Sequence, residues 1–234
     1  MKNWMERRRL RYKRHPTVSF SDVRDAFRTG DIILFHKTTR SGVLDILELD
    51  ILAPMFFDES EFRHSGIIVR RDDQLFVMEC TEPTHSGYAH ANYPTGGKGI
   101  REVPLDALLE EYSRDNGDAP FGVRYIAEEI PLEILQETIR EVGPVSYMKA
   151  HTTVPIFLSQ YVLPDAIVRR VAQVPRHQMM CSEFVHRVLS GCGVLRDYPS
   201  KLFAPYIIEN SSQFSSHAII RYSDIVRFTW PSGN

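Results

Sequence analysis

The chain has 234 residues, of which 43% are hydrophobic and 25% are charged, and its formal net charge at pH 7 is -2. This length suits one substantial hydrophobic core and is short for two ordinary domains joined by a linker. The composition is that of a globular protein and excludes a disordered chain. Because the net charge is small, no nucleic-acid partner is expected.

Basic residues are concentrated at the N-terminus. Within residues 1–16, Lys and Arg outnumber acidic residues by seven to one. Such a charge run is typical of a solvated tail, but it also suits contact with an anionic surface such as lipid headgroups. We therefore expect residues 1–16 to form a basic arm and residues 17–234 to form a single domain.

Nothing in the sequence indicates secretion or membrane insertion. No apolar stretch follows the basic arm, as a secretory signal requires, and no uncharged run is long enough to span a bilayer. The three cysteines include no C-x-x-C pair and do not suggest a disulfide framework. The expected location is the cytoplasm, with peripheral attachment to a membrane through the arm as the alternative.

The first part of the chain predicts short helices and apolar strands. Ser19–Phe27 has the pattern of a short helix. After a Gly-Asp pair comes Ile32–Phe35, a short apolar run typical of a buried strand. Gly42–Phe57 has apolar residues at helical spacing as far as Pro54, which predicts an amphipathic helix.

A β-hairpin is expected next. Gly66–Val69 and Leu75–Met78 are strand-like runs separated by five polar residues. Thr81–Gly99 then predicts a long loop rich in Gly, Pro, Asn, His and Tyr, and loops of this length in compact domains are usually functional or mobile.

The second half of the chain mixes both kinds of element. We expect strands at Ile100–Val103, at Phe121–Ile126 and within Ala218–Trp230, and helices at Pro104–Tyr112, Leu132–Glu141, Ser159–Val171 and Met180–Leu189. This order, with a sequential hairpin in the first half, predicts an α+β fold with a mostly antiparallel sheet.

Cys181 lies at an expected helix N-terminus, in the sequence Met-Cys-Ser-Glu-Phe-Val. Only a thiolate is a good nucleophile, and the unpaired N–H groups and partial positive charge of a helix N-terminus lower the pKa of a thiol. The same N–H groups stabilise an oxyanion. A free cysteine is more often a small buried hydrophobe, and Cys80 and Cys192 have that pattern. Cys181 is therefore the candidate nucleophile.

His64 is the candidate base. A thiolate nucleophile needs a base, usually a His that is held by a third polar group. His64 stands at the start of the apolar strand Gly66–Val69, where a rigid element would hold it in place. A lone His in such a position is more often structural, so the assignment depends on a partner.

The partner is expected across the hairpin. If the turn is centred just after residue 71, Glu79 lies opposite His64 and points to the same face. Glu79 ends an apolar run, so its carboxylate would be partly buried and would need a partner such as an imidazole. A turn one residue longer at its centre would place Cys80 opposite His64 instead. The alternative orienting residues are Thr81 and Glu82.

Five segments of the chain together resemble a known family. They are Gly30–Phe35, Arg63–Ile67, Met78–Thr81, Gly143–Tyr147 and Cys181–Val185. This ordered set resembles the permuted YaeF/YiiX-type branch of the NlpC-like papain superfamily, which includes bacterial cell-wall amidases and, in a related permuted branch, the lecithin retinol acyltransferase group. In ordinary members the Cys helix precedes the His strand, whereas here the His precedes the Cys.

The resemblance implies a permuted papain-like fold of the α+β class, with a small, barrel-like antiparallel sheet packed against helices. It implies Cys181 as nucleophile, His64 as base, Glu79 as orienting acid and Tyr147 near the site. Ser182, which follows the Cys, is the other supporting residue that we expect there. The implied activity is hydrolysis of an amide or peptide-type bond through a thioester, and no cofactor is implied.

Residues 150–176 look like an insertion before the Cys helix. Their apolar residues suit either a core or lid helix, or a hydrophobic substrate wall or membrane-facing cap. The second reading, together with the basic arm, keeps a lipid ester or acyl group open as the substrate of the same site, for hydrolysis or acyl transfer. A third possibility is a non-catalytic binding module in which the triad is a relic.

A metal hydrolase is not expected. The sequence has no H-E-x-x-H motif and no close Cys/His cluster. His85 and His90 lie five residues apart in one loop but lack a partnering carboxylate motif. We therefore predict no metal site.

Overall fold

The structure is a computed structural model that describes residues 16–36, 61–81, 99–116, 119–147, 178–198, 203 and 205–231. Several expectations lie outside these residues: the basic arm up to residue 15, the helices expected at Gly42–Phe57 and Ser159–Val171, nearly all of the loop Thr81–Gly99, and the apolar segment 150–176.

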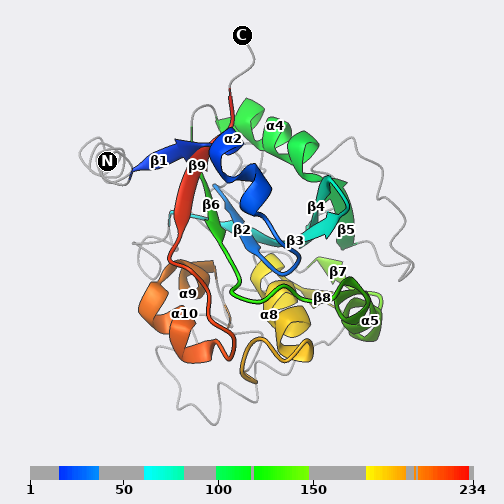
Figure 1. Cartoon of the computed structure of the whole chain (residues 1–234). Coiled ribbons are helices and arrows are strands. Elements are labelled where there is room, and N and C mark those ends of the chain that lie inside the picture. The colour runs from blue at the N-terminus through cyan, green and yellow to red at the C-terminus, as the bar shows by residue number, and fades with distance from the viewer. Residues whose placement is uncertain are drawn as a thin grey trace, which may run out of the picture.

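Among the described residues, seven strands form one sheet in the order β1-β9-β6-β2-β3-β4-β5 (Figure 1). These strands are β1 (Thr17–Ser19), β2 (Ile32–Phe35), β3 (His64–Arg71), β4 (Gln74–Cys80), β5 (Ile100–Pro104), β6 (Phe121–Arg124) and β9 (Val226–Thr229). Neighbouring strands are antiparallel except for β1 and β9, which are parallel. A separate parallel pair joins β7 (Ser146–Tyr147) to β8 (Gln178–Met179).

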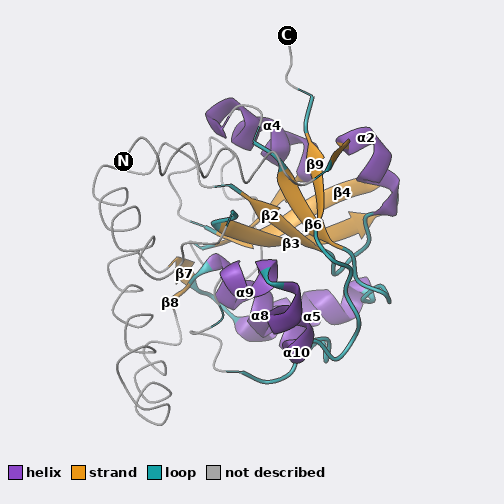
Figure 2. Ribbon diagram, turned by 90° about the vertical axis from the view of Figure 1, so that its left-hand side faces the viewer, coloured by secondary structure: helices purple, strands orange, loops and turns teal. Residues whose placement is uncertain are grey.

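Helices cover both faces of the sheet. They are α2 (Phe20–Val23), α4 (Leu105–Asn116), α5 (Leu132–Val142), α8 (Cys181–Gly191), α9 (Pro205–Glu209) and α10 (Ser211–His217), with a 3-10 turn at Arg24–Ala26. Figure 2 shows α2 and α4 on one side of the sheet and α5, α8, α9 and α10 on the other. The described residues therefore form an α+β structure, as the order of elements predicted, and its helices and sheet make three layers.

The alternation of side chains along each strand produces the two cores. On β2, Ile33 and Phe35 pack in the core that includes α2 and α4, whereas Ile32 and Leu34 pack in the core that includes α5 and α8. All four side chains are fully buried. Because successive residues of a strand point to opposite faces, a continuous apolar run is what a strand covered on both faces needs. Each such side chain stabilises the fold by about 1.5–3 kcal/mol.

The β3–β4 hairpin forms as predicted, but with another register. Arg71 pairs with Gln74, so the turn consists of Asp72 and Asp73, and Asp72 takes a φ of 52°. The expected pairing of residues 64 and 79 is wrong by two residues. A shift of two leaves every side chain on its expected face, because side chains repeat with a period of two.

The Gly-Asp pair before β2 closes a tight connection. Gly30 has a φ of 104°, which a residue with a Cβ rarely adopts, and that Cβ would lie 2.8 Å from the side chain of Ile130. The Asp31 carboxylate accepts hydrogen bonds from the backbone N–H groups of Arg28 and Ile126, each at 2.7 Å. Burial raises the pKa of Asp31 to about 7. Asp31 thus ties the start of β2 to the segment after β6.

The expected small antiparallel sheet needs correction in two respects. The sheet has seven strands among the described residues, and its β1–β9 pair is parallel. Two short helices, α9 and α10, were not expected, because neither is long enough to show a clear helical period. None of the described helices is long and apolar enough to cross a membrane.

Candidate active site

Cys181 is the first residue of α8. The preceding Met180 is extended, with φ −90° and ψ 168°, and no side chain caps the helix. Apolar residues at helical spacing hold α8 against the sheet, among them Phe184, Val185 and Val188, which are fully buried. The helix N-terminus is therefore held rigidly, and no side chain of the N-cap residue occupies its first backbone N–H groups.

The surroundings of Cys181 favour its thiolate. Burial by itself would raise the pKa of the thiol, but the positive charge on His64 and hydrogen bonds from the backbone N–H groups of Ser65 and Ser182 lower it. The Cys181 Sγ also lies 4.0 Å from the carbonyl oxygen of Arg63. The sulfur is thus enclosed between the start of β3 and the N-terminus of α8.

His64 is the first residue of β3 and pairs with Phe35 of β2. Its Nε2 lies 2.6 Å from Oε2 of Glu79. Burial would lower the pKa of His64, but the negative charges of Cys181 and Glu79 outweigh it and raise the pKa to about 10. The raised imidazole pKa and the lowered thiol pKa both favour a thiolate–imidazolium pair.

Glu79 is fully buried and has two cationic neighbours. Across the ladder, Glu79 pairs with Arg101 of β5, and the Arg101 Nε and Nη2 atoms both contact its Oε1 at 2.5 Å. Burial would raise the pKa of Glu79, but the charges of His64 and Arg101 lower it to about 2. The carboxylate is therefore ionised at neutral pH, with one oxygen for the imidazole and one for the guanidinium.

The sequence did not identify Arg101. A signal was present, because an arginine in an expected apolar strand is expensive to bury unless it meets an acid. Which acid it meets depends on the order of the strands, and that order follows from tertiary structure alone.

Two aromatic rings hold the imidazole from the side of α4. The ring centroids of His64 and Tyr112 are 6.1 Å apart with an interplanar angle of 17°, and Phe35 packs against both rings. Burial raises the pKa of Tyr112 well above its ordinary value, so the phenol stays neutral. Tyr112 was also missed, because nothing in the sequence shows which residue of α4 reaches the site.

Gly66 allows β4 to approach β3 near the site. A Cβ at this position would lie 2.6 Å from Cγ1 of Val77 and 3.0 Å from the backbone oxygen of Met78. Any side chain here would push apart the two strands that carry His64 and Glu79.

The expected supporting residues take different positions. The Ser182 backbone N–H faces the sulfur, while its buried hydroxyl has no hydrogen-bond partner among the described residues. Tyr147 pairs with Met179, so its strand runs beside the segment that leads into Cys181, and its side chain packs against the apolar core. The orienting contact to His64 comes from Glu79 rather than from Thr81, and Glu82 lies outside the described residues.

No group of three or more His, Cys, Asp or Glu side chains is placed to hold a metal ion within the part of the chain that the structure describes.

No family model matches the chain. Among solved structures, it is similar to the metalloprotein YiiX from Escherichia coli O157:H7, at 16% identity and a TM-score of 0.39, over 70% of this chain and 66% of that one. It is also similar to "Uncharacterized protein R372" of Acanthamoeba polyphaga mimivirus, at 32% identity over 216 residues, which cover 90% of this chain and 85% of the viral protein. At this identity and coverage, the chain belongs to the same family as the mimivirus protein.

Proposed function

We propose that the protein is a cysteine-nucleophile hydrolase of the permuted papain-like type, which cleaves an amide or peptide-type bond through a thioester. The observation that carries the proposal is a line of two contacts: the Cys181 sulfur is hydrogen-bonded to the His64 imidazole, and the imidazole contacts Glu79. A nucleophile, a base and an orienting acid in this arrangement are what thiol-based acyl transfer requires.

Each residue has one role in the proposed reaction. The Cys181 thiolate attacks the substrate carbonyl carbon, and the backbone N–H groups at the start of α8 stabilise the negative charge that forms on the oxygen. The imidazolium of His64 gives its proton to the leaving amine, which departs as the thioester forms. Neutral His64 then takes a proton from water, whose oxygen attacks the thioester and releases a carboxylic acid and the thiolate.

Glu79 keeps the imidazole in the productive orientation and stabilises its charged form. Its own charge is held by Arg101, so it does not compete for the proton of His64. Residues that orient a base in this way are positioning residues, and their removal lowers the rate without removing the nucleophile.

The test of the proposed function is the rate of alkylation of Cys181 by iodoacetamide as a function of pH, read by mass spectrometry. Cys80 and Cys192 serve as internal controls, since Cys80 is fully buried and burial raises the pKa of Cys192. We expect Cys181 to react fastest below neutral pH, and His64→Ala to move its reaction to alkaline pH. Equal behaviour of the three thiols would overturn the proposal and favour a binding module with a relic site.

A lipid ester is the second candidate substrate for the same site. The basic residues of the N-terminal arm favour it, because they suit an anionic membrane surface. Co-sedimentation with anionic vesicles, with and without residues 1–15, tests this choice. Binding that disappears at high salt and on truncation supports a lipid substrate, and its absence leaves the amide as the candidate.

A further inference from the structure

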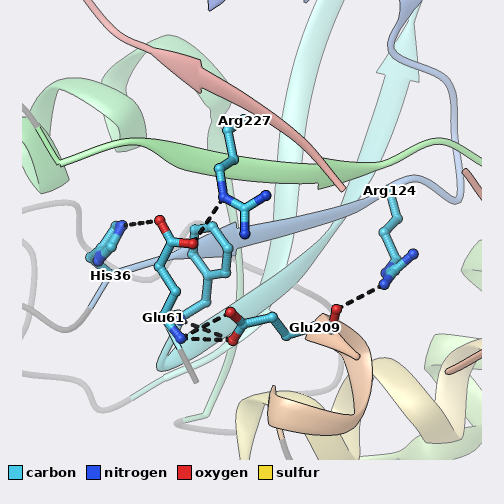
Figure 3. Close-up of polar contacts among 6 residues, drawn as sticks. His36, Glu61, Arg124, Glu209 and Arg227 are labelled. Atoms are coloured by element: carbon cyan, nitrogen blue, oxygen red, sulfur yellow. Dashed lines mark hydrogen bonds and ion pairs between the residues drawn. The ribbon is translucent and has the colours of Figure 1, made fainter. Parts of the chain in front are cut away.

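The segment that leads into His64 is fixed by a carboxylate from the C-terminal part of the chain. The backbone N–H of Glu61 donates to both oxygens of Glu209, at 3.0 Å to Oε1 and 2.8 Å to Oε2, and the N–H of Phe62 donates to Oε2 at 3.4 Å (Figure 3). Glu209 ends helix α9, and residues 61 and 62 lie three and two residues before His64, the first residue of β3. Hydrogen bonds from N–H groups to a carboxylate are among the stronger ones in proteins.

The side chain of Glu61 fixes the same segment from another direction. Its Oε2 accepts a hydrogen bond from Nε of Arg227 on β9 at 2.9 Å, and its Oε1 lies 3.5 Å from Nε2 of His36, which follows β2 (Figure 3). Burial would raise the pKa of Glu61, but His36 and Arg227 lower it. Glu61 therefore stays anionic and contacts both a residue of β9 and the residue that follows β2.

Glu209 is itself held in place. Arg124 at the end of β6 is fully buried and donates to the last carbonyls of α9, from Nε to Ile208 at 2.6 Å and from Nη2 to Glu209 at 3.0 Å. Its Nη1 donates to the carbonyl of Ser223. Burial lowers the pKa of Arg124 to about 10, which leaves it cationic at neutral pH. A cation at a helix C-terminus stabilises that end of the helix, and here it holds the backbone of the residue that carries the Glu209 carboxylate.

The Phe62 ring and the Arg63 backbone also hold this segment against the rest of the structure. The Phe62 ring is fully buried and lies where a Cβ on Gly122 would come within 2.8 Å of it. The N–H of Arg63 donates to the carbonyl of Phe35 at 2.9 Å, and its own carbonyl lies 4.0 Å from the Cys181 sulfur. The segment thus has little freedom to move relative to Cys181.

We propose that Glu209 is a positioning residue of the active site, which sets the place of His64 beside Cys181 by holding the N–H groups of Glu61 and Phe62. The inference rests on the proposed function. By this inference α9 helps to position the catalytic base, although the helix lies more than a hundred residues from His64 in sequence. A displacement of the base by about 1 Å lowers the rate of a reaction of this kind by about a hundredfold.

The experiment compares Glu209→Gln and Glu209→Ala with a matched pair, Asp31→Asn and Asp31→Ala. Asp31 is the right control because its carboxylate also accepts hydrogen bonds from two backbone N–H groups, at the start of β2. Phe35 at the other end of β2 is the residue that pairs with His64. The two pairs of variants remove the same kind of contact, and the cost in folding stability is measured for each by urea unfolding.

Two readouts follow the site in all variants. The first is the pH midpoint of Cys181 alkylation. The second is the titration of the His64 imidazole by NMR of 15N-labelled histidine, with its signal assigned by its loss in His64→Gln. We expect Glu209→Ala to lower the imidazole pKa by about one unit or more, as when an ion pair is separated, and to raise the alkylation midpoint. Glu209→Gln keeps one acceptor oxygen, so its imidazole pKa and its alkylation midpoint should lie between those of the wild type and those of Glu209→Ala.

The outcomes are separable. If both Glu209 variants keep the wild-type imidazole titration while unfolding as easily as the Asp31 variants, Glu209 is structural and the proposal is wrong. If the Asp31 variants shift the pKa of the His64 imidazole by the same amount, the effect comes from a general loosening of the structure and the proposal is also wrong. If wild-type Cys181 is unreactive below neutral pH, the proposed hydrolase function fails, while the imidazole titration still decides whether Glu209 positions His64.

Discussion

Glu79 and Arg101 face each other across β4 and β5 as a buried ion pair, and the same carboxylate contacts His64 through its other oxygen. The pair therefore connects β5, at the edge of the sheet, to the site. Breaking a buried ion pair at one partner costs about 3–5 kcal/mol, because the other charge is left uncompensated.

Arg101→Met is expected to lower the free energy of unfolding by about that amount and to slow Cys181 alkylation below neutral pH. Without the guanidinium the pKa of Glu79 rises, and Glu79 then supports the imidazolium less well. Urea unfolding and the alkylation assay measure the two effects. The double variant Arg101→Met with Glu79→Leu should be more stable than the single variant, and its Cys181 should react at least as slowly. A single variant that is as stable as the wild type would contradict the ion pair.

The loss of folding stability at acid pH is expected to depend on Glu79. Its pKa is about 2 in the folded protein against 4.5 ordinarily, so its contribution to stability is complete above pH 4.5 and is lost as the pH falls toward 2. The double variant without Glu79 should lose less stability over this range. Urea unfolding at a series of pH values measures the difference. If the free energy of unfolding depends on pH in the same way in the wild type and in the double variant, the pKa of Glu79 is not lowered.

Tyr112 is expected to act through its ring. Tyr112→Phe keeps the stack on His64 and should keep the pH profile of Cys181 alkylation close to that of the wild type. Tyr112→Leu removes the flat surface and should slow alkylation several-fold near neutral pH. If the Phe variant is as slow as the Leu variant, the hydroxyl is the important group instead.

Gly66→Ala is expected to destabilise the fold by about 1–3 kcal/mol through overpacking, since the new Cβ meets the backbone of β4 as well as a side chain. It should also slow alkylation, because the strands that carry His64 and Glu79 are forced apart. Ser215→Ala on the exposed surface of α10 is the control and should change neither property. If Gly66→Ala has the same free energy of unfolding as the wild type, β4 can move to accommodate the added methyl group and the prediction is wrong.

The position of a thiol at a helix start, a histidine at a strand start and an acid at the end of the paired strand could be predicted from the sequence. Each depends on local patterns: the helical spacing after Cys181, and the apolar runs after His64 and before Glu79. The expected contact between the His64 and Glu79 side chains is present although the predicted hairpin register was wrong by two residues, because side chains of a strand repeat with a period of two.

What the sequence by itself determined was therefore the kind of each element and which face its side chains share, since both follow from periodicity along the chain. Only the tertiary structure decided which elements meet. The strand order places Arg101 beside Glu79. Tyr112 reaches His64 from α4, on the side of the sheet away from α8. Glu209 reaches the segment before β3 from α9. These contacts join residues far apart in the chain, and the physical reason for them is the packing of strands and helices around two apolar cores, which local pattern does not encode.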